Sequence, residues 1–276
     1  QQRDDPLAAL RVQTGQWQSF WLDVEAEGSC KPGTYPIELQ LKDTKNENVL
    51  ATISVSVTIL PGMLPPQKLI RTHWFHADCL AEYYRVPVFS EEHWSIIEKF
   101  IRVAVRRGCN MILTPLFTPP LDTAPGGERL TVQLVDVTVH DGEYSFGFER
   151  MERWVEVCRR CGVSYLEMAH LFTQWGAKAA PKIMAAIDGV EKRLFGWETD
   201  AHGEEYARFL REFLPALMDE LKRLGVADLV YFHISDEPSL EHLEDYRHAC
   251  SLVKPYIQGR PVIDALSDFA FYQTGA

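Results

Sequence analysis

The chain has 276 residues, of which 46% are hydrophobic and 24% charged, and its formal net charge is -11. This composition is typical of a globular protein with room for one large domain or two smaller ones. The acidic balance argues against a nucleic-acid binder or a protein that binds anionic membranes, because both need a basic surface. No stretch approaches the roughly 20 apolar residues of a membrane span.

The first residues, Gln1–Asp5, do not resemble a signal peptide, and the six cysteines are too scattered to indicate a disulfide framework. A cytoplasmic location is therefore favoured, although the missing initiator Met indicates a trimmed start. No cofactor is expected, and no oligomeric state is indicated.

Residues 1–63 alternate apolar and polar positions with the period of two that is typical of β-strands. The alternating apolar residues are Phe20, Leu22, Val24, Ile37, Leu39, Leu41, Ile53, Val55, Val57 and Ile59. About three strands are expected, fewer than the about seven of a complete sandwich. This segment is therefore predicted to be the C-terminal part of a β-sandwich domain. The proline-rich stretch Leu60–Pro66 is predicted to be a stiff linker, so the domain boundary is expected near residue 64.

From residue 64 to 276, candidate strands alternate with amphipathic helices, which predicts βα units around a parallel sheet. The candidate strands are Leu69–Phe75, Asn110–Thr114, Ser164–His170, Leu229–Ile234 and Pro261–Ala265. The fold class is therefore α/β, and we expect a (β/α)8 TIM-type barrel. About five βα units fit in about 200 residues, whereas a closed barrel needs about 250. The barrel is thus predicted to be incomplete at its C-terminus, with an open sheet as the alternative.

Four helices are predicted from their apolar stripes and end signals. Ser90 is expected to cap the first, and Gly162 to end the second, which covers Glu149–Cys161. The third spans about Glu204–Leu224, where Pro215 should kink or restart it. The fourth spans about Ser239–Val253.

The pair Cys158 and Cys161 forms a CxxC motif within the second helix. No second CxxC and no nearby His pair accompanies it, as a typical structural zinc site would require. Core packing is therefore favoured over a redox or metal role, because a buried free Cys behaves as a small hydrophobe.

Two long connections interrupt the alternation of strands and helices. In residues 130–148 an Asp141-Gly142 pair stands between two alternating runs, which predicts an inserted β-hairpin. Residues 171–203 are predicted to be a long irregular connection and a candidate lid or substrate loop.

The most informative motif is Asp236-Glu237-Pro238, directly after the apolar run Leu229–Ser235. Successive side chains of a strand point to opposite faces, so both carboxylates can reach one pocket only if the strand has ended there. Pro238 makes that ending plausible. Asp236 and Glu237 are therefore candidate catalytic residues. The alternative is a helix start, with Asp236 or Ser239 as the cap.

In a parallel barrel the active site forms at the C-terminal ends of the strands. Carboxylates, imidazoles and indoles are expected to meet there, a combination that favours a carbohydrate substrate. The candidate substrate-binding residues are His73, Trp74, Thr114, His170, Gln174, Trp175, Trp197, His233 and Asp264.

Each of these candidates also has a structural interpretation. The indoles of Trp74 and Trp175 are equally compatible with loop packing. A metal site at His73, His76 and Asp78 is disfavoured, because no second His pair follows on later strands. Glu167 is either a second catalytic carboxylate or a buried structural group, and the structural role is favoured.

The sequence resembles the catalytic domain of glycoside hydrolase family 123 and its relatives, many of them known as domain of unknown function 4091. The resemblance covers about residues 64–276 and extends to the sandwich that precedes the barrel. It is carried by the runs Leu171–Ala177, Pro181–Ala185, Leu194–Trp197 and Phe232–Pro238. It implies a retaining, substrate-assisted β-N-acetylgalactosaminidase-type reaction, with Glu237 as general acid/base and Asp236 orienting the 2-acetamido group.

Two other functions remain open. In an ordinary retaining barrel glycosidase, Glu237 keeps its role as the acid and the nucleophile lies outside this chain. In a non-catalytic sugar-binding barrel, neither carboxylate reacts.

Overall fold

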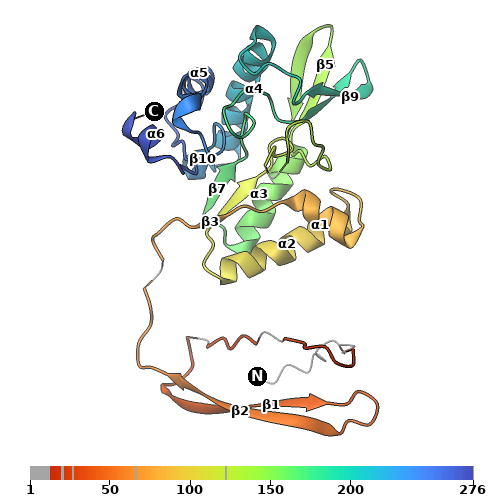
Figure 1. Cartoon of the computed structure of the whole chain (residues 1–276), viewed down its shortest axis with the longest axis vertical. Coiled ribbons are helices and arrows are strands. Elements are labelled where there is room, and N and C mark those ends of the chain that lie inside the picture. The colour runs from red at the N-terminus through yellow and green to blue at the C-terminus, as the bar shows by residue number, and fades with distance from the viewer. Residues whose placement is uncertain (1–12, 20–21, 27, 66, 122, 276) are drawn as a thin grey trace. The chain divides into compact units, whose positions relative to one another are not determined.

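The computed structural model describes residues 13–19, 22–26, 28–65, 67–121 and 123–275. The chain forms two compact units, Gln1–Gln67 and Lys68–Ala276 (Figure 1). This division falls a few residues after the boundary predicted near residue 64.

The first unit contains one antiparallel pair, β1 (Gly33–Lys42) and β2 (Val49–Ile59), in which Ile37 lies opposite Val55 and Leu39 opposite Ile53. Paired residues share a face, so these side chains form an apolar surface, and Ile53 remains 60% exposed. The strand expected around Leu22 and Val24 is not formed over residues 22–26, and Phe20 lies outside the described residues. The assignment of this unit to a β-sandwich therefore stays a prediction.

The second unit is built on a parallel sheet of four short strands in the order β3-β4-β7-β10. They are β3 (Thr72–His73), β4 (Met111–Thr114), β7 (Tyr165–Met168) and β10 (Val230–Phe232). Each lies within a predicted segment. The fifth predicted strand is reduced to a parallel bridge between Phe232 and Val262.

This sheet does not close over the described residues, so the expected barrel is not observed. A small barrel closes with about eight strands, and fewer strands leave two sheet edges apart. The fold is α/β with an open parallel sheet, in which each strand pairs with the next strand of that sheet along the chain.

The described part of the second unit also contains six α-helices and two short 3-10 helices. They are α1 (Ala77–Tyr84), α2 (Glu91–Arg106), α3 (Glu149–Cys161), α4 (Glu204–Arg223), η1 (Ala227–Leu229), η2 (Leu240–His242), α5 (Leu243–Val253) and α6 (Phe269–Gln273). The Ser90 hydroxyl accepts the backbone N–H of His93 at 3.2 Å, and Gly162 ends α3 with φ +85°, which confirms both predicted helix ends. Among the described residues, no helix combines the length and apolar character needed to cross a bilayer.

Helix α4 runs through Pro215 as one element, so the predicted restart does not occur. Proline removes one backbone donor and crowds the preceding turn. The apolar face of α4 is fully buried at Phe209, Phe213 and Leu217, and burying such side chains contributes roughly 1.5–3 kcal/mol each. That burial outweighs the local cost of the proline.

A second, four-stranded sheet, in the order β6-β5-β8-β9, lies beside α4 (Figure 1). Its first hairpin, β5 (Asp136–His140) and β6 (Glu143–Gly147), is the predicted one, with φ +50° at Asp141 and +82° at Gly142. Residues 171–203, predicted to be irregular, contain a second hairpin, β8 (Ile183–Ile187) and β9 (Val190–Phe195). The ring of Tyr144 meets Phe209 of α4 edge to face, with centroids 5.3 Å apart.

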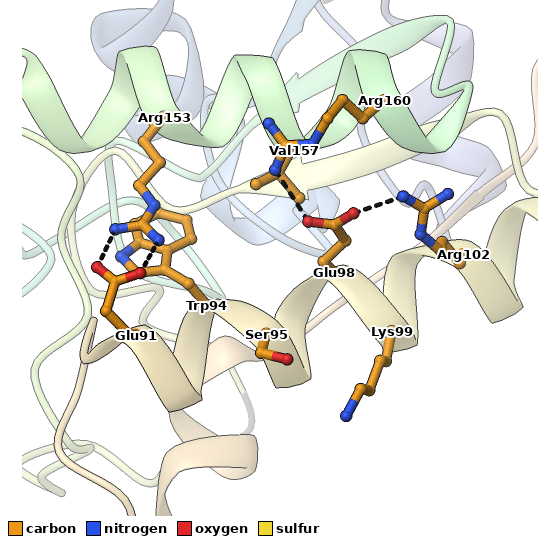
Figure 2. A pocket seen from close by; sticks show the side chains of 9 residues that line it. All are labelled: Glu91, Trp94, Ser95, Glu98, Lys99, Arg102, Arg153, Val157 and Arg160. Carbon is orange, nitrogen blue, oxygen red and sulfur yellow. Dashed lines mark hydrogen bonds and ion pairs between the residues drawn. The ribbon is translucent and has the colours of Figure 1, made fainter.

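Helices α2 and α3 lie side by side, joined by ion pairs on their outer surface (Figure 2). Arg153 binds both carboxylate oxygens of Glu91 at 2.6 Å, and Arg160 reaches Glu98 at 2.9 Å. Beneath them Cys158 and Cys161 belong to the hydrophobic core, as predicted. Burial raises the pKa of both thiols, which disfavours the thiolate that redox or metal chemistry requires.

Candidate active site

At the carboxyl end of the parallel sheet, a fully buried carboxylate gathers side chains from the neighbouring strands. Glu167 of β7 accepts the indole N–H of Trp74 at 2.9 Å, and the same oxygen lies 2.5 Å from Nε2 of His233. Its other oxygen accepts the hydroxyl of Thr72. Burial raises the pKa of Glu167, but the hydrogen bonds from His233, Thr72 and Trp74 outweigh it and hold the pKa below its usual value. Glu167 is therefore an ionised carboxylate with structural partners.

The ring of His170 stacks on that of His233, with centroids 4.1 Å apart, and meets Trp74 edge to face at 5.3 Å. His170 is buried, and neither of its ring nitrogens has a hydrogen-bond partner within the described part of the chain. Burial, followed by the nearby His233 and His76, holds the pKa of His170 well below its usual value. A neutral imidazole with two unsatisfied nitrogens is unusual in a protein interior and favours a polar ligand at this position.

The two adjacent carboxylates of the motif occupy different environments. Strand β10 ends at Phe232, and Glu237 adopts a left-handed conformation with φ +46°. Asp236 is buried, at 6% exposed, whereas Glu237 is exposed to solvent. The expected end of the strand is therefore present. Asp236 is not the cap of the next helix, because η2 begins at Leu240 with Ser239 at its N-cap position, and the Ser239 side chain makes no capping hydrogen bond.

The loop after β7 runs along the loop after β10 and brings Trp175 next to the carboxylate pair. The backbone N–H of Trp175 donates to the carbonyl of Asp236 at 3.0 Å, and the hydroxyl of Ser235 donates to the carbonyl of Thr173 at 2.8 Å. The Trp175 side chain is 50% exposed, which leaves it accessible to a ligand. The buried Gln174 donates to the carbonyl of Thr123 at 2.9 Å and so ties this loop to the preceding connection.

Gly176 follows Trp175 with φ +122°, and a Cβ placed there would lie 2.8 Å from Cδ2 of His242. We expect Gly176→Ala to lower the free energy of unfolding by about 1–3 kcal/mol, through backbone strain and the displaced ring. Urea unfolding measures the loss. Gly259→Ala is the matched control, because Gly259 has φ +73° but open space around it. An equal loss in both variants would attribute the effect to strain alone and contradict the close contact with His242.

Asp264 follows the bridge between Val262 and Phe232, which brings it to the same end of the sheet. Its pKa is raised to about 7, mainly by burial and to a lesser degree by the neighbouring Asp236, while His233 and a hydrogen bond from Tyr246 oppose the shift. The structure thus groups Asp264 electrostatically with Asp236 and His233. This carboxyl group therefore titrates near neutral pH.

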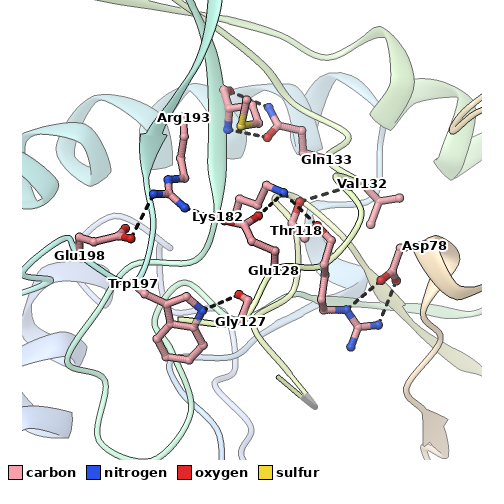
Figure 3. A network of polar contacts seen from close by, with 12 residues as sticks. Asp78, Thr118, Gly127, Glu128, Val132, Gln133, Lys182, Arg193, Trp197 and Glu198 are labelled. Carbon is pink, nitrogen blue, oxygen red and sulfur yellow. Dashed lines mark hydrogen bonds and ion pairs between the residues drawn. The ribbon is translucent and has the colours of Figure 1, made fainter. Parts of the chain in front are cut away.

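Three predicted substrate-binding residues make their polar contacts outside the Glu167 cluster and away from Asp236 and Glu237. His73 is exposed on the opposite face of β3 from Thr72, with Nε2 3.3 Å from Nη2 of Arg71. The buried hydroxyl of Thr114 lies 3.3 Å from the carbonyl of Ile112 in its own strand. Trp197 donates to the carbonyl of Gly127 at 3.0 Å, within a network of ion pairs around Glu128 (Figure 3). Their roles in substrate binding stay predictions.

Asp78, considered above as a metal ligand, forms an ion pair with Arg129 at 2.8 Å (Figure 3). Both residues line a groove of about 750 Å³ that also reaches His76, the neighbour of His170. Sequence patterns indicated neither Arg129 nor Tyr246. Thr72 had a recognisable signal, since it lies two positions before Trp74 in a strand and therefore on the same face.

Comparison with known proteins was made for sequence and for structure. The family description "Glycoside hydrolase 123, catalytic domain" matches residues 74–276. No curated protein matches the sequence. A family 123 glycoside hydrolase from Clostridium perfringens, solved in a study of glycolipid glycan hydrolysis, is similar in structure with a TM-score of 0.63 at 14% identity. The match covers 86% of this chain and 42% of that one, so this chain spans less than half the length of that enzyme.

At this identity the structural likeness speaks for the fold alone, whereas the sequence match extends over most of the chain. It includes the Asp236-Glu237 motif and every residue of the Glu167 cluster except Thr72. The chain therefore belongs to glycoside hydrolase family 123 through its catalytic domain.

Proposed function

We propose that this protein is a retaining glycosidase that hydrolyses β-linked N-acetylhexosamine, of the N-acetylgalactosamine type, with assistance from the substrate. The observation that carries the proposal is the different placement of adjacent carboxylates, Asp236 buried and Glu237 exposed in a left-handed turn. A non-glycine residue in that conformation is uncommon, and such residues concentrate at functional sites.

In the proposed reaction the acetamido carbonyl oxygen of the substrate attacks the anomeric carbon while Glu237 protonates the leaving oxygen. Asp236 orients the acetamido group and stabilises the positive charge of the oxazolinium intermediate. Water then attacks the anomeric carbon, gives its proton to Glu237 and reopens the ring. Because the substrate supplies the nucleophile, the enzyme needs no second carboxylate about 5 Å away across the anomeric carbon.

The surroundings of the pair fit a sugar ligand. Trp175 offers an accessible aromatic ring, and the unsatisfied nitrogens of His170 can exchange hydrogen bonds with sugar hydroxyls. The similar Clostridium perfringens enzyme comes from work on glycolipid glycans, so we propose glycans of that kind as the first natural substrates to test.

The decisive experiment compares aryl β-N-acetylgalactosaminide and β-N-acetylglucosaminide with matching glycosides that lack the acetamido group. We expect hydrolysis only when the acetamido group is present, because that group forms the first bond to the anomeric carbon. Equal cleavage without it would overturn substrate assistance and favour an ordinary retaining mechanism with a protein nucleophile. Binding of these glycosides without any turnover would favour the sugar-binding alternative.

A further inference from the structure

Glu167 is a buried carboxylate with three side-chain hydrogen-bond partners, yet the proposed reaction gives it no part. Its donors come from two directions across the sheet, Thr72 and Trp74 from β3 and the residue after it, and His233 from the end of β10. Glu167 is 0% exposed. A carboxylate in such a place remains ionised only when its hydrogen bonds compensate for the lost water, and here they do.

The ionised state of Glu167 fixes the proton on His233. An ionised carboxylate accepts hydrogen bonds and donates none, so the hydrogen between Oε1 of Glu167 and Nε2 of His233 must belong to the histidine. When the ring carries only that one proton, the other nitrogen, Nδ1, holds a lone pair. Nδ1 of His233 is buried and has no hydrogen-bond partner among the residues described.

The plane of the His233 ring is fixed by its neighbours. His170 stacks on it at an interplanar angle of 24°, and Trp74 meets it edge to face at 82°. Glu167 also accepts the indole N–H of Trp74, so one carboxylate holds two of the three rings. The direction in which Nδ1 points is therefore set by Glu167 together with the two ring contacts.

We propose that Glu167 is a positioning residue that fixes His233 in the Nε2–H form, so that Nδ1 accepts a hydrogen bond from a substrate hydroxyl. The inference rests on the proposed function, since it concerns the same sugar site. It deepens that function by one requirement: the sugar must present a hydroxyl to His233, and a deoxy or methylated sugar at that position leaves Nδ1 unsatisfied. A buried acceptor left unpaired costs about 1–3 kcal/mol, which corresponds to roughly 5- to 150-fold in affinity.

The first test is NMR of the whole chain labelled with 15N-histidine, with His233 assigned by the missing signal of His233→Gln. We expect a protonated Nε2 and an unprotonated Nδ1 in the wild type, and an upfield shift of Nδ1 on saturation with N-acetylgalactosamine. A proton on Nδ1 would overturn the inference. So would an Nδ1 signal that does not move at saturation with the sugar.

The second test uses Glu167→Gln, whose amide can donate to Nε2 and thereby favour the Nδ1–H form. We expect the NMR signals of His233 to become those of the Nδ1–H form. We also expect the KM for the aryl N-acetylhexosaminide to rise about tenfold, with a smaller change in kcat. Thr72→Val is the matched control, because it removes a hydrogen bond from the same carboxylate but keeps the charge and the contact with His233. An equal rise in KM in the control, without a change of the histidine signals, would assign Glu167 a purely structural role.

The two proposals fail separately. The form of His233 in the wild type is read without turnover, so an inactive protein with an Nε2–H signature and a sugar-dependent Nδ1 shift would refute hydrolysis and retain the positioning role. An active protein in which His233 carries its proton on Nδ1 would support hydrolysis and refute the positioning role of Glu167. The wild-type spectrum also decides the matter if Glu167→Gln does not fold.

Discussion

Glu237→Gln is expected to lower kcat/KM for an aryl β-N-acetylhexosaminide by about 10²- to 10⁴-fold, the usual contribution of a general acid/base. The amide can neither protonate the leaving oxygen nor take a proton from the attacking water. Glu237 is exposed, so the substitution should leave the fold intact. Steady-state kinetics of the purified variant measure the loss, and unfolding in urea checks that the stability is unchanged.

Glu241→Gln is the matched control, since Glu241 is an exposed glutamate four positions further along, in η2. Its kinetics should equal those of the wild type. The size of the loss in Glu237→Gln should also depend on the leaving group, because a very acidic phenol departs without protonation. A loss that is the same for good and poor leaving groups would contradict the role of Glu237 as the acid.

Local signals in the sequence were sufficient for elements whose pattern is long and whose ends are marked. Helix α3 follows its apolar stripe and ends before Gly162, and the β5–β6 hairpin forms at Asp141-Gly142. The β8–β9 hairpin carries an equally clear signal in the sequence, an Asp188-Gly189 pair between two short runs. In the structure these two residues adopt φ +49° and +80°. The prediction of one irregular connection over residues 171–203 is therefore wrong for β8 and β9.

Other features depend on contacts that a linear pattern does not contain. Helix α1 has only 8 residues, too few for a periodic stripe, and Pro215 is tolerated because of tertiary burial rather than local propensity. Barrel closure depends on the number of strands that meet in space.

The candidate site was only partly predictable for the same reason. The position of Asp236 and Glu237 after a strand could be read from the chain, because Pro238 and the apolar run mark the strand end. The stack of His170 on His233 and the contact of His233 with Glu167 could not, since His233 lies 63 positions from His170 and 66 positions from Glu167 along the chain. In the same way, no sequence pattern distinguishes Asp264, which changes its charge near neutral pH, from Asp268, which does not.

Asp264→Asn is expected to gain stability relative to the wild type as the pH rises from 5 to 8, by about 2–3 kcal/mol in the free energy of unfolding. The reason is the raised pKa of Asp264, about 7 in the folded protein against an ordinary value of 3.8. Between these two values the folded state holds a proton that the unfolded state has lost. The wild type therefore loses the contribution of Asp264 as the pH rises through this window, and the loss levels off above about pH 7.

Asparagine cannot ionise, so the variant is free of this pH-dependent loss while keeping the shape of the side chain. Urea unfolding at pH 5, 6, 7 and 8, followed by tryptophan fluorescence, gives the difference between variant and wild type at each pH. Asp268→Asn is the matched control. Hydrogen bonds from the backbone N–H groups of Leu240, Phe271 and Ala270 hold the pKa of Asp268 below its usual value, against the opposing effect of burial. Its charge is therefore constant from pH 5 to 8, and the control should show no pH-dependent difference.

The pH dependence of this difference also bears on the site itself, because burial is the main cause of the raised pKa and the charge of Asp236 adds to it. If the proximity of Asp236 matters, Asp236→Asn should lower the pKa of Asp264 and shift the loss of stability to lower pH. If the loss stays in the same window, burial alone holds the proton on Asp264, and the two carboxyl groups act independently. A flat difference between Asp264→Asn and the wild type from pH 5 to 8 would mean that Asp264 is ionised throughout, and that it faces the substrate as a second anion.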